Sequence, residues 1–232
     1  MITTMTGLPI LFEDGEAMVI DKPAGLPVDP PRSGVESLAD HLDSLRFGFQ
    51  REPLPVHRLD TDTSGCLLLA RNPKAHKRFA LAFEEKRVEK TYIGLVAGVV
   101  AEESGTIELA LAKISSAERG WRMIPAKKGK PAVTHWQRLA VIDGITVVRF
   151  TPLTGRTHQI RIHALAGLGF PLVGDPVYGE PHPRAGRTML HAAALVLDRG
   201  SKPPIAAVSP LPSDFRAFGV EDTGQWPSPT PA

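Results

Sequence analysis

One stretch of the sequence is more informative than the rest: His57-Arg58-Leu59-Asp60-Thr61-Asp62-Thr63-Ser64-Gly65. It places carboxylates, bases and hydroxyl groups between a proline-rich loop and an entirely apolar segment. A polar loop joined to a rigid strand is a frequent position for an active site. Read from the residues alone, Asp60 or Asp62 could equally form a turn or cap a helix.

Strands are predicted wherever β-branched and other apolar residues run together between turn-forming residues. These segments are about 17–20, 66–70, 92–97, 105–110, 133–142, 145–153 and 189–197. Asp143-Gly144 predicts a tight hairpin between the fifth and the sixth of them. Strands joined by short turns pair antiparallel, and with few helices among them the pattern indicates the α+β class.

Helices are predicted at three positions. Ser33 and Glu36 have the spacing of a capping box, so an amphipathic helix is expected over about 35–45. Asn72-Pro73 is a favourable cap and first turn for the next helix, which has an apolar face. A third amphipathic segment, about 159–166, ends at glycines.

The length of 232 residues and the hydrophobic content of 42% are enough for one large core. We expect a single domain over 1–218. The last stretch, 219–232, is rich in Pro, Thr and Ser and has little to bury, so we expect a disordered tail there.

Cysteine content and hydropathy bear on the compartment. Cys66 is the only cysteine, so neither an internal disulfide nor a cysteine-based zinc site can form. The sequence has no apolar run long enough to span a membrane and no secretory signal pattern at its start. We therefore expect a cytoplasmic protein without membrane contact.

The net charge of +2 is only mildly basic, but the bases are unevenly distributed. Two runs have few acidic neighbours, and their members are Arg71, Lys74, Lys77 and Arg78 in one and Lys113, Arg119, Arg122, Lys127, Lys128, Lys130 and Arg138 in the other. Such runs could contact the phosphates of a nucleic acid or could simply be a solvated face.

The eight histidines raise the question of whether the protein binds a metal. His158 and His163 are the closest pair in the third helix, but a separation of five residues does not place them on one helix face. No carboxylate completes a ligand set, so we expect no metal.

A second informative stretch, 155–163, places two arginines among apolar residues, where a charge usually has a partner. Together the two stretches and three shorter ones resemble the RluA family of RNA pseudouridine synthases. The motifs are His57-Arg58-Leu59-Asp60 with Thr63-Ser64-Gly65, Lys90-Thr91-Tyr92, Gly155-Arg156-Thr157-His158-Gln159-Ile160-Arg161, Pro171-Leu172-Val173-Gly174-Asp175 and Leu190-His191-Ala192. The resemblance extends from about Val19 to Phe215.

The resemblance implies a single α+β catalytic domain with a long mixed, mainly antiparallel sheet, flanking helices and a central active-site cleft. It also implies the conversion of uridine in RNA to pseudouridine. That reaction breaks the bond from ribose C1′ to N1, turns the uracil and joins C1′ to C5. Because nothing is oxidised or consumed, no cofactor is expected, and the sequence has no phosphate-binding Gly-Lys-Ser/Thr loop.

Three catalytic roles follow from the resemblance. Asp60 is expected to be the catalytic carboxylate, as a nucleophile or as a base that removes a ribose proton. Arg161 is expected to lower the pKa of that carboxylate. Tyr92 is expected to stack on the target base; without the motif it would be read as an ordinary core aromatic.

Other motif residues are expected to bind the substrate. Leu190 would pack the other side of the pocket, and Arg58 would fill the space left by the flipped base. Alternatively, Arg58 could contact a phosphate or pair with Asp62. The complete set of predicted substrate-binding residues is His57, Arg58, Leu59, Thr63, Arg156, His158, Gln159, Leu190, Lys127 and Lys128.

The expected partner is a stem-loop of ribosomal or transfer RNA, bound by a monomer. Only about sixteen residues precede the first predicted strand, so we expect no N-terminal RNA-binding domain of the S4 type. Two alternative functions remain. One is an RNA-binding chaperone that has lost catalysis, against which the intact Asp60, Tyr92 and Arg161 argue. The other is a glycoside hydrolase, which would usually need two positioned acids.

Overall fold

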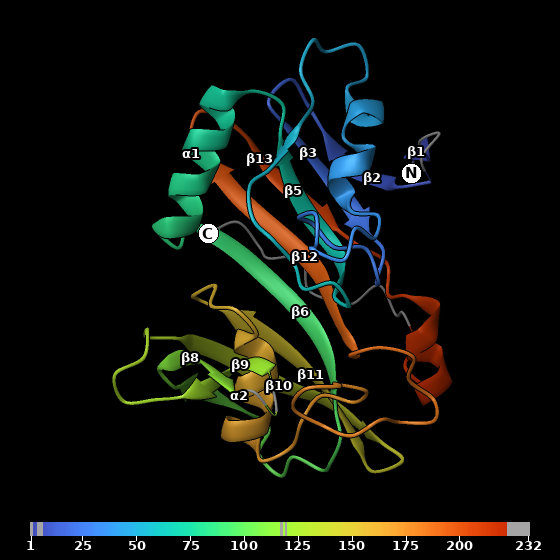
Figure 1. Cartoon of the computed structure of the whole chain (residues 1–232), viewed down its shortest axis with the longest axis vertical. Coiled ribbons are helices and arrows are strands. Elements are labelled where there is room, and N and C mark those ends of the chain that lie inside the picture. The colour runs from blue at the N-terminus through green and yellow to red at the C-terminus, as the bar shows by residue number, and fades with distance from the viewer. Residues whose placement is uncertain (1, 4–6, 117, 119, 222–232) are drawn as a thin grey trace. The chain divides into compact units, whose positions relative to one another are not determined.

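The computed structural model describes residues 2, 3, 7–116, 118 and 120–221 (Figure 1). The described chain forms two compact units. Unit 1 combines the residues up to Lys90 with His191–Leu211, and unit 2 combines Thr91–Leu190 with Pro212–Glu221. Each unit is thus assembled from segments that are distant in sequence.

The sheet of unit 1 has the strand order β1-β2-β3-β5-β12-β13, and β4 pairs with β5 on a second path. Its members are β1 (Ile2–Thr3), β2 (Pro9–Glu13), β3 (Ala17–Lys22), β4 (Leu54–Pro55), β5 (Ser64–Ala70), β12 (Leu190–Arg199) and β13 (Lys202–Val208). All these pairs are antiparallel except β5 with β12, which run parallel. Every residue of β5 is buried, as expected for a central strand.

Helix α1 (Pro73–Glu84) covers this sheet, and Figure 1 shows it alongside the strands of unit 1. The Asn72 side chain accepts a hydrogen bond from the backbone N–H of Ala75 at 2.9 Å, so the predicted cap is confirmed. Phe79 and Ala82 on the buried face of the helix pack against the apolar side chains of β3, β5, β12 and β13.

The helix predicted over 35–45 is wrong. The segment forms two short 3₁₀ turns, η1 (Leu38–His41) and η2 (Asp43–Leu45). The reciprocal cap lies further along the chain than predicted, because Asp40 accepts hydrogen bonds from the backbone N–H and the hydroxyl of Ser37. The predicted apolar positions are nevertheless buried, since two tight turns place them on one side as a helix would.

The sheet of unit 2 has the strand order β6-β11-β10-β7, and all its pairs are antiparallel. Its strands are β6 (Val88–Val96), β7 (Ser104–Glu108), β10 (Val133–Ile142) and β11 (Ile145–Pro152). Asp143 and Gly144 join the last two with φ angles of +50° and +77°, as the predicted hairpin turn requires. A short 3₁₀ helix, η3 (Ser213–Phe218), also belongs to this unit.

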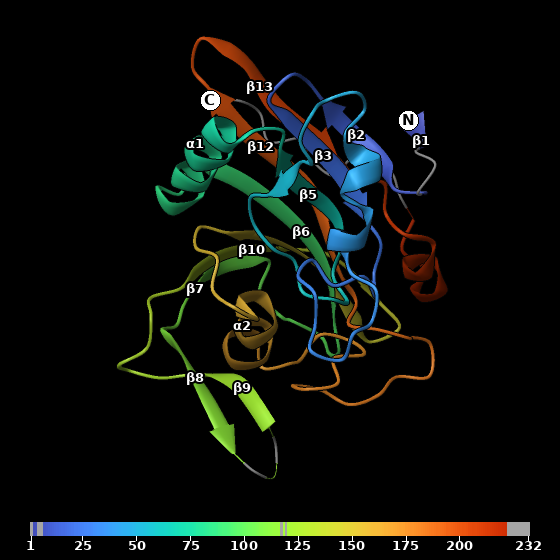
Figure 2. The ribbon, with the colours of Figure 1, turned by 45° about the horizontal axis from the view of Figure 1, so that its top comes forward.

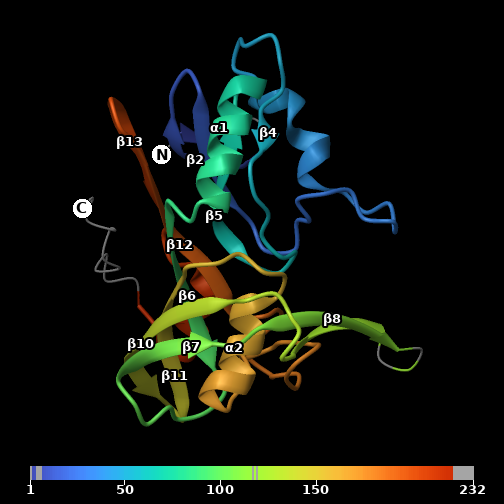
Figure 3. The same cartoon turned by 90° about the vertical axis from the view of Figure 1, so that its left-hand side faces the viewer.

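Helix α2 (Gln159–Leu168) lies between this sheet and a separate hairpin of β8 (Leu111–Ser116) and β9 (Gly120–Pro125). Ile160 packs with the side chains of the sheet, whereas Ile162 packs with Leu111 and Met123 of the hairpin. The expected amphipathic pattern is therefore wrong, because α2 is covered on two sides. Figures 2 and 3 show the hairpin projecting from the rest of unit 2.

The seven predicted strands are all present, and the α+β class is confirmed. The remaining strands were not predicted from the sequence: β1, β2, β4, β13 and the two strands of the β8–β9 hairpin. Of the predicted tail, 219–232, the residues from 222 onward lie outside the part of the chain that the structure describes. Its first residues do not behave as a tail, since Gly219 ends η3 and Val220 is buried. The single domain over 1–218 stays a prediction.

Gly65 is a strict steric requirement in unit 1, at the point where β5 meets β12. Its φ angle is +107°, and a Cβ atom there would lie 2.2 Å from the carbonyl oxygen of Ala192. An L side chain is strained at this φ, and backbone cannot move aside as the end of a side chain can. Only glycine therefore allows the two parallel strands to approach this closely.

We predict that Gly65→Ala lowers the free energy of unfolding by about 2 kcal/mol or more, because the new Cβ collides with backbone. Urea denaturation measures this loss. Gly15→Ala is the matched control, since nothing lies within 4 Å of a Cβ there. Equal stability of the two variants would contradict the steric account.

Candidate active site

The loop that carries Asp60 leads directly into β5. The backbone N–H of Thr63 donates to the carbonyl oxygen of Asp60 at 3.0 Å, which closes a tight turn. Leu59 and Thr63 on either side of this turn are buried, whereas Asp60 is half-buried. The carboxylate thus lies on a short turn that is anchored at both ends.

The side chain of Lys22, at the end of β3, holds this loop in place. It is fully buried, and its ammonium donates to three carbonyl oxygens: Pro23 at 2.8 Å, Leu26 at 2.8 Å and Thr61 at 3.1 Å. The backbone N–H of Gly25 donates to the Thr61 carbonyl oxygen as well, at 2.9 Å. The turn after β3 and the Asp60 loop are therefore held together through one buried charge.

A polar network lies beside the loop, where β5 begins. The Ser64 hydroxyl lies 2.9 Å from Nδ1 of His191, and His191 Nε2 lies 3.4 Å from the carbonyl oxygen of Ser209. The Ser209 hydroxyl donates to Asp21 at 2.8 Å. Burial raises the pKa of the Asp21 carboxyl, and the hydrogen bond from Ser209 opposes that rise. These contacts tie three strands of unit 1 to the start of the loop.

His57 is a structural residue of this loop rather than an exposed base. Its Nε2 accepts a hydrogen bond from the backbone N–H of Leu68 at 3.0 Å, and its ring stacks on Phe83 with centroids 4.6 Å apart. Burial and the nearby charge of Lys90 lower the pKa of His57 to about 3. His57 is therefore neutral at pH 7, as its role as an acceptor requires.

Two further buried groups have strongly shifted pKa values. Burial lowers the pKa of Lys90 to about 8, and its ammonium lies 5.7 Å from the centre of the Phe83 ring. Burial raises the pKa of the Cys66 thiol to about 12, so this cysteine is no nucleophile at neutral pH.

Arg58 is the exposed member of the motif. Its guanidinium pairs with Asp29 at 3.1 Å, and about two thirds of each side chain is exposed, 70% and 64% respectively. An ion pair in this position is worth at most about 1 kcal/mol. The arginine can therefore exchange this partner for another at little cost.

Arg161 in unit 2 is held by a carboxylate from the fourth motif. Its Nε and Nη2 donate to the two oxygens of Asp175, each at 2.7 Å, and both side chains are buried. Asp175 also accepts from the backbone N–H of Val177 at 2.9 Å and of Tyr178 at 3.1 Å. A forked pair with this many bonds fixes the plane of the guanidinium.

Tyr178 connects Arg161 to His158. The Arg161 guanidinium lies 4.9 Å from the centre of the Tyr178 ring, and the Tyr178 hydroxyl lies 2.8 Å from Nδ1 of His158. The hydroxyl also accepts from the backbone N–H of Met123 at 2.9 Å, so it links His158 to β9. His158 itself has a left-handed backbone, with φ +53°, at the start of α2.

Gln159 is buried and its amide is fully used within unit 2. The oxygen accepts from the Thr154 hydroxyl at 2.7 Å and from the backbone N–H of Arg156 at 3.0 Å. The nitrogen donates to the Val133 carbonyl at 3.0 Å and to the Thr134 hydroxyl at 2.9 Å. These bonds fill its capacity and favour a positioning role, so its predicted contact with the substrate stays a prediction.

The remaining predicted site residues of unit 2 differ in exposure. Tyr92 is half-buried against the apolar side chains around α2, and Leu190 is buried in the same cluster. Arg156 is exposed, and its Nε donates to the Pro131 carbonyl at 3.1 Å. Lys127 and Lys128 are exposed in a turn closed by a hydrogen bond from Gly129 to Ala126.

Comparison with known proteins decides the family. The model of the family described as RNA pseudouridylate synthase matches residues 16–166, which include Asp60, Tyr92 and Arg161. This chain belongs to that family. The predicted family, reaction type and fold class are therefore confirmed.

Individual relatives agree with this assignment. An RNA pseudouridine synthase of Zymomonas mobilis subsp. mobilis is 54% identical over 211 residues, which cover 90% of this chain and 96% of that protein. The dual-specificity RNA pseudouridine synthase RluA of Haemophilus ducreyi is 34% identical over 224 residues, 92% of each chain. The solved structure of human RNA Pseudouridylate Synthase Domain Containing 1 matches with a TM-score of 0.75 at 31% identity, covering 91% of this chain and 87% of that one.

Three residues that orient the site of this pseudouridine synthase were not among the predicted site residues: Lys22, Asp175 and Tyr178. The signal for Lys22 is a lysine that ends an apolar strand immediately before a Pro-Ala-Gly turn. Asp175 lies in a recognised motif, but its pairing with Arg161 depends on packing rather than on spacing. The sequence gives no comparable signal for Tyr178.

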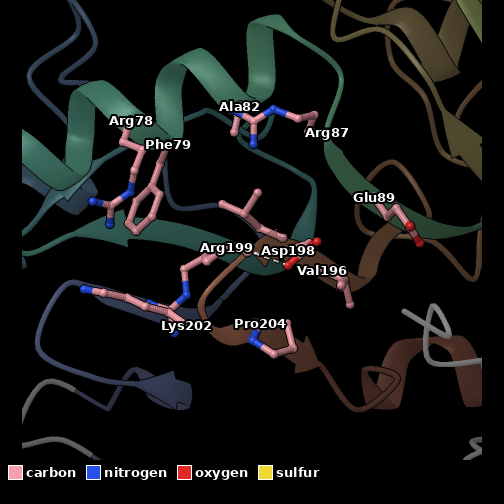
Figure 4. A pocket seen from close by; sticks show the side chains of 12 residues that line it. Arg78, Phe79, Ala82, Arg87, Glu89, Val196, Asp198, Arg199, Lys202 and Pro204 are labelled. Atoms are coloured by element: carbon pink, nitrogen blue, oxygen red, sulfur yellow. Dashed lines mark hydrogen bonds between the residues drawn. The ribbon is translucent and has the colours of Figure 1, made fainter. Parts of the chain in front are cut away.

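A large hollow lies elsewhere in unit 1 (Figure 4). It measures about 760 Å³ and lies between α1 and the carboxyl end of β12, whereas the Asp60 loop precedes the amino end of the parallel strand β5. Its cations are already paired, Arg78, Arg199 and Lys202 with Glu16, and Arg87 with Glu85. The hollow is therefore no candidate for the reaction site.

Neither a metal cluster nor a membrane helix occurs in the part of the chain that the structure describes. No three His, Cys, Asp or Glu side chains gather there as a metal site would require. No helix in this part has the length and apolar character needed to cross a bilayer.

We predict that Lys22→Met lowers the free energy of unfolding by about 2 kcal/mol or more, because three carbonyl oxygens of two loops lose their charged donor. Thermal or urea unfolding measures the loss, and the exposed Lys77→Met is the matched control on α1. If Lys22→Met is as stable as Lys77→Met, the buried ammonium does not hold the loop.

Proposed function

We propose that this enzyme isomerises specific uridines in ribosomal or transfer RNA, with Asp60 as the catalytic carboxylate and without a cofactor. The anchored turn at Asp60 supports this proposal most directly. A family motif supplies the carboxylate, and Lys22 and the Thr63 turn hold its backbone in place. A fixed carboxylate suits a reaction that needs one group next to the sugar.

Asp60 can open the reaction in two ways. As a nucleophile it attacks C1′, and the uracil leaves with the electron pair of the C1′–N1 bond. As a base it removes a ribose proton, and the electrons of that C–H bond expel the uracil to give a glycal. In the first route C5 of the turned uracil displaces Asp60 from C1′, and in the second C5 bonds to C1′ of the glycal while Asp60 returns the proton to the ribose carbon. C5 then loses its proton and N1 gains one, so atoms and electrons balance.

Tyr92 and Arg161 are proposed to assist from unit 2. Tyr92 would stack on the target uracil, which suits a half-buried ring at the edge of an apolar cluster. Arg161 would supply the positive charge that keeps the catalytic carboxylate ionised, and Asp175 fixes its orientation. Leu190 would add apolar surface beside the base.

RNA recognition is proposed to use the exposed bases. A stacked uridine must be flipped out before it can react, at a cost of a few kcal/mol. Arg58 can fill the vacated space because its pairing with Asp29 is weak. The name of the Haemophilus ducreyi relative states dual specificity for RNA, which supports more than one kind of RNA as a candidate substrate.

We further propose that the protein acts as a cytoplasmic monomer. The single, buried cysteine is consistent with a reducing compartment.

We predict that Asp60→Asn reduces turnover at least about a thousand-fold while RNA binding changes little, because the carboxylate makes or breaks bonds only during the reaction. Release of tritium from RNA labelled at uridine C5 measures turnover, and filter binding measures affinity. Asp62→Asn is the matched control in the same loop. Retained turnover in Asp60→Asn, with loss in Asp62→Asn, would move the role to Asp62.

We predict that the double change Lys127→Ala and Lys128→Ala weakens RNA binding several-fold and makes it less dependent on salt. Each lysine that contacts a phosphate releases about one counterion on binding. The slope of log affinity against log salt concentration measures how many phosphates each variant neutralises. The pair Lys74→Ala and Lys77→Ala on α1 is the control. Equal salt dependence in the wild type and the first double variant would place the RNA elsewhere.

A further inference from the structure

Trp121 on β9 is a large aromatic side chain that is 47% exposed. It pairs with Ser115 across the hairpin, and Lys113 lies next along β8 on the same face. The indole is not covered by the core that buries Met123 two residues later on the same face of the hairpin. The ring is therefore a candidate contact surface.

Neighbouring side chains hold the Trp121 ring in a defined orientation. His158 stacks on it with centroids 5.0 Å apart and an angle of 29° between the planes. His158 is in turn fixed by the hydroxyl of Tyr178, which also accepts from the backbone of Met123. The Lys113 ammonium lies 4.7 Å from the centre of the indole, on a flexible stem that can move aside. The ring is thus ordered before anything binds.

The segment that contains Trp121 is strongly basic. Between 111 and 130 the sequence has six Lys and Arg residues and a single acid, Glu118. Ordered aromatic rings within a basic surface are the usual means of binding unpaired nucleotides, because every base can stack and every phosphate is attracted. An apolar protein partner would need a contiguous apolar patch, whereas the same face presents Lys113 and Ser115.

A series of side-chain contacts connects Trp121 with residues of the candidate site. Trp121 contacts His158, His158 contacts Tyr178, and Tyr178 lies against the Arg161 guanidinium. All four belong to unit 2. A nucleotide stacked on Trp121 would therefore lie close to His158, which belongs to the third family motif.

We propose that Trp121 is a stacking platform for an unpaired RNA base other than the target uridine. This inference rests on the proposed function for the identity of the RNA, but it concerns binding and not the reaction. The β8–β9 hairpin would then distinguish single-stranded from paired RNA, because a base in a loop can reach the ring, whereas a base inside a duplex cannot. Lys113 would then pair with the phosphate that accompanies the stacked base.

The test compares two synthetic RNAs of equal length, a hairpin with a loop of uridines and a fully paired duplex. Trp121→Ala should weaken binding of the hairpin about 5- to 100-fold, the usual effect of one lost base stack, and should leave duplex binding unchanged. Trp121→Phe should retain most of the affinity. Ile114→Ala, on the opposite face of the β8–β9 hairpin of the protein, is the matched control and should bind both RNAs normally.

Fluorescence provides an independent readout, since a stacked base quenches indole emission. The hairpin should quench the wild type and the Asp60→Asn variant, and most of this quenching should be absent in Trp121→Phe. Unchanged hairpin affinity in Trp121→Ala, or an equal loss for hairpin and duplex, would overturn the platform. Because Asp60→Asn tests the reaction separately, normal hairpin binding in Trp121→Ala with lost turnover in Asp60→Asn would refute this inference alone.

Discussion

The buried ammonium of Lys22 is the interaction on which the candidate site of unit 1 depends. It donates to carbonyl groups of two loops at once and so connects the two loops. One of those carbonyls belongs to Thr61, the residue after Asp60. The proposed role of Asp60 requires that its loop be fixed, and the ammonium of Lys22, the last residue of β3, contributes to this fixation.

Unit 2 also contains a buried cation whose position is fixed by its partners. Arg161 is buried, and its partner Asp175 is itself held by two backbone N–H groups. A buried arginine without such a carboxylate would be costly, so the pair must form as the unit folds. Tyr178 then extends the ordered region to His158 and Trp121. Both units therefore present polar groups whose orientation is set before substrate arrives.

The sequence predicted most of the fold because the strong signals are local. The Asn72 cap, the Asp143-Gly144 turn and the apolar run of β5 each depend on a few adjacent residues. The errors arise where tertiary contacts decide. The β8–β9 hairpin has only two residues, Leu111 and Met123, in a buried cluster, so its pattern is weak. Motifs identified Asp60 and Arg161, but no spacing rule connects Lys22 with Thr61 or Arg161 with Asp175.

The most direct test of the central claim is pseudouridine mapping of total ribosomal and transfer RNA. Cells that lack this protein are compared with the same cells given either the natural chain or its Asp60→Ala form. The account predicts at least one pseudouridine that is lost without the protein and restored by the natural chain alone. Restoration by Asp60→Ala as well, or no site that depends on the protein, would contradict it.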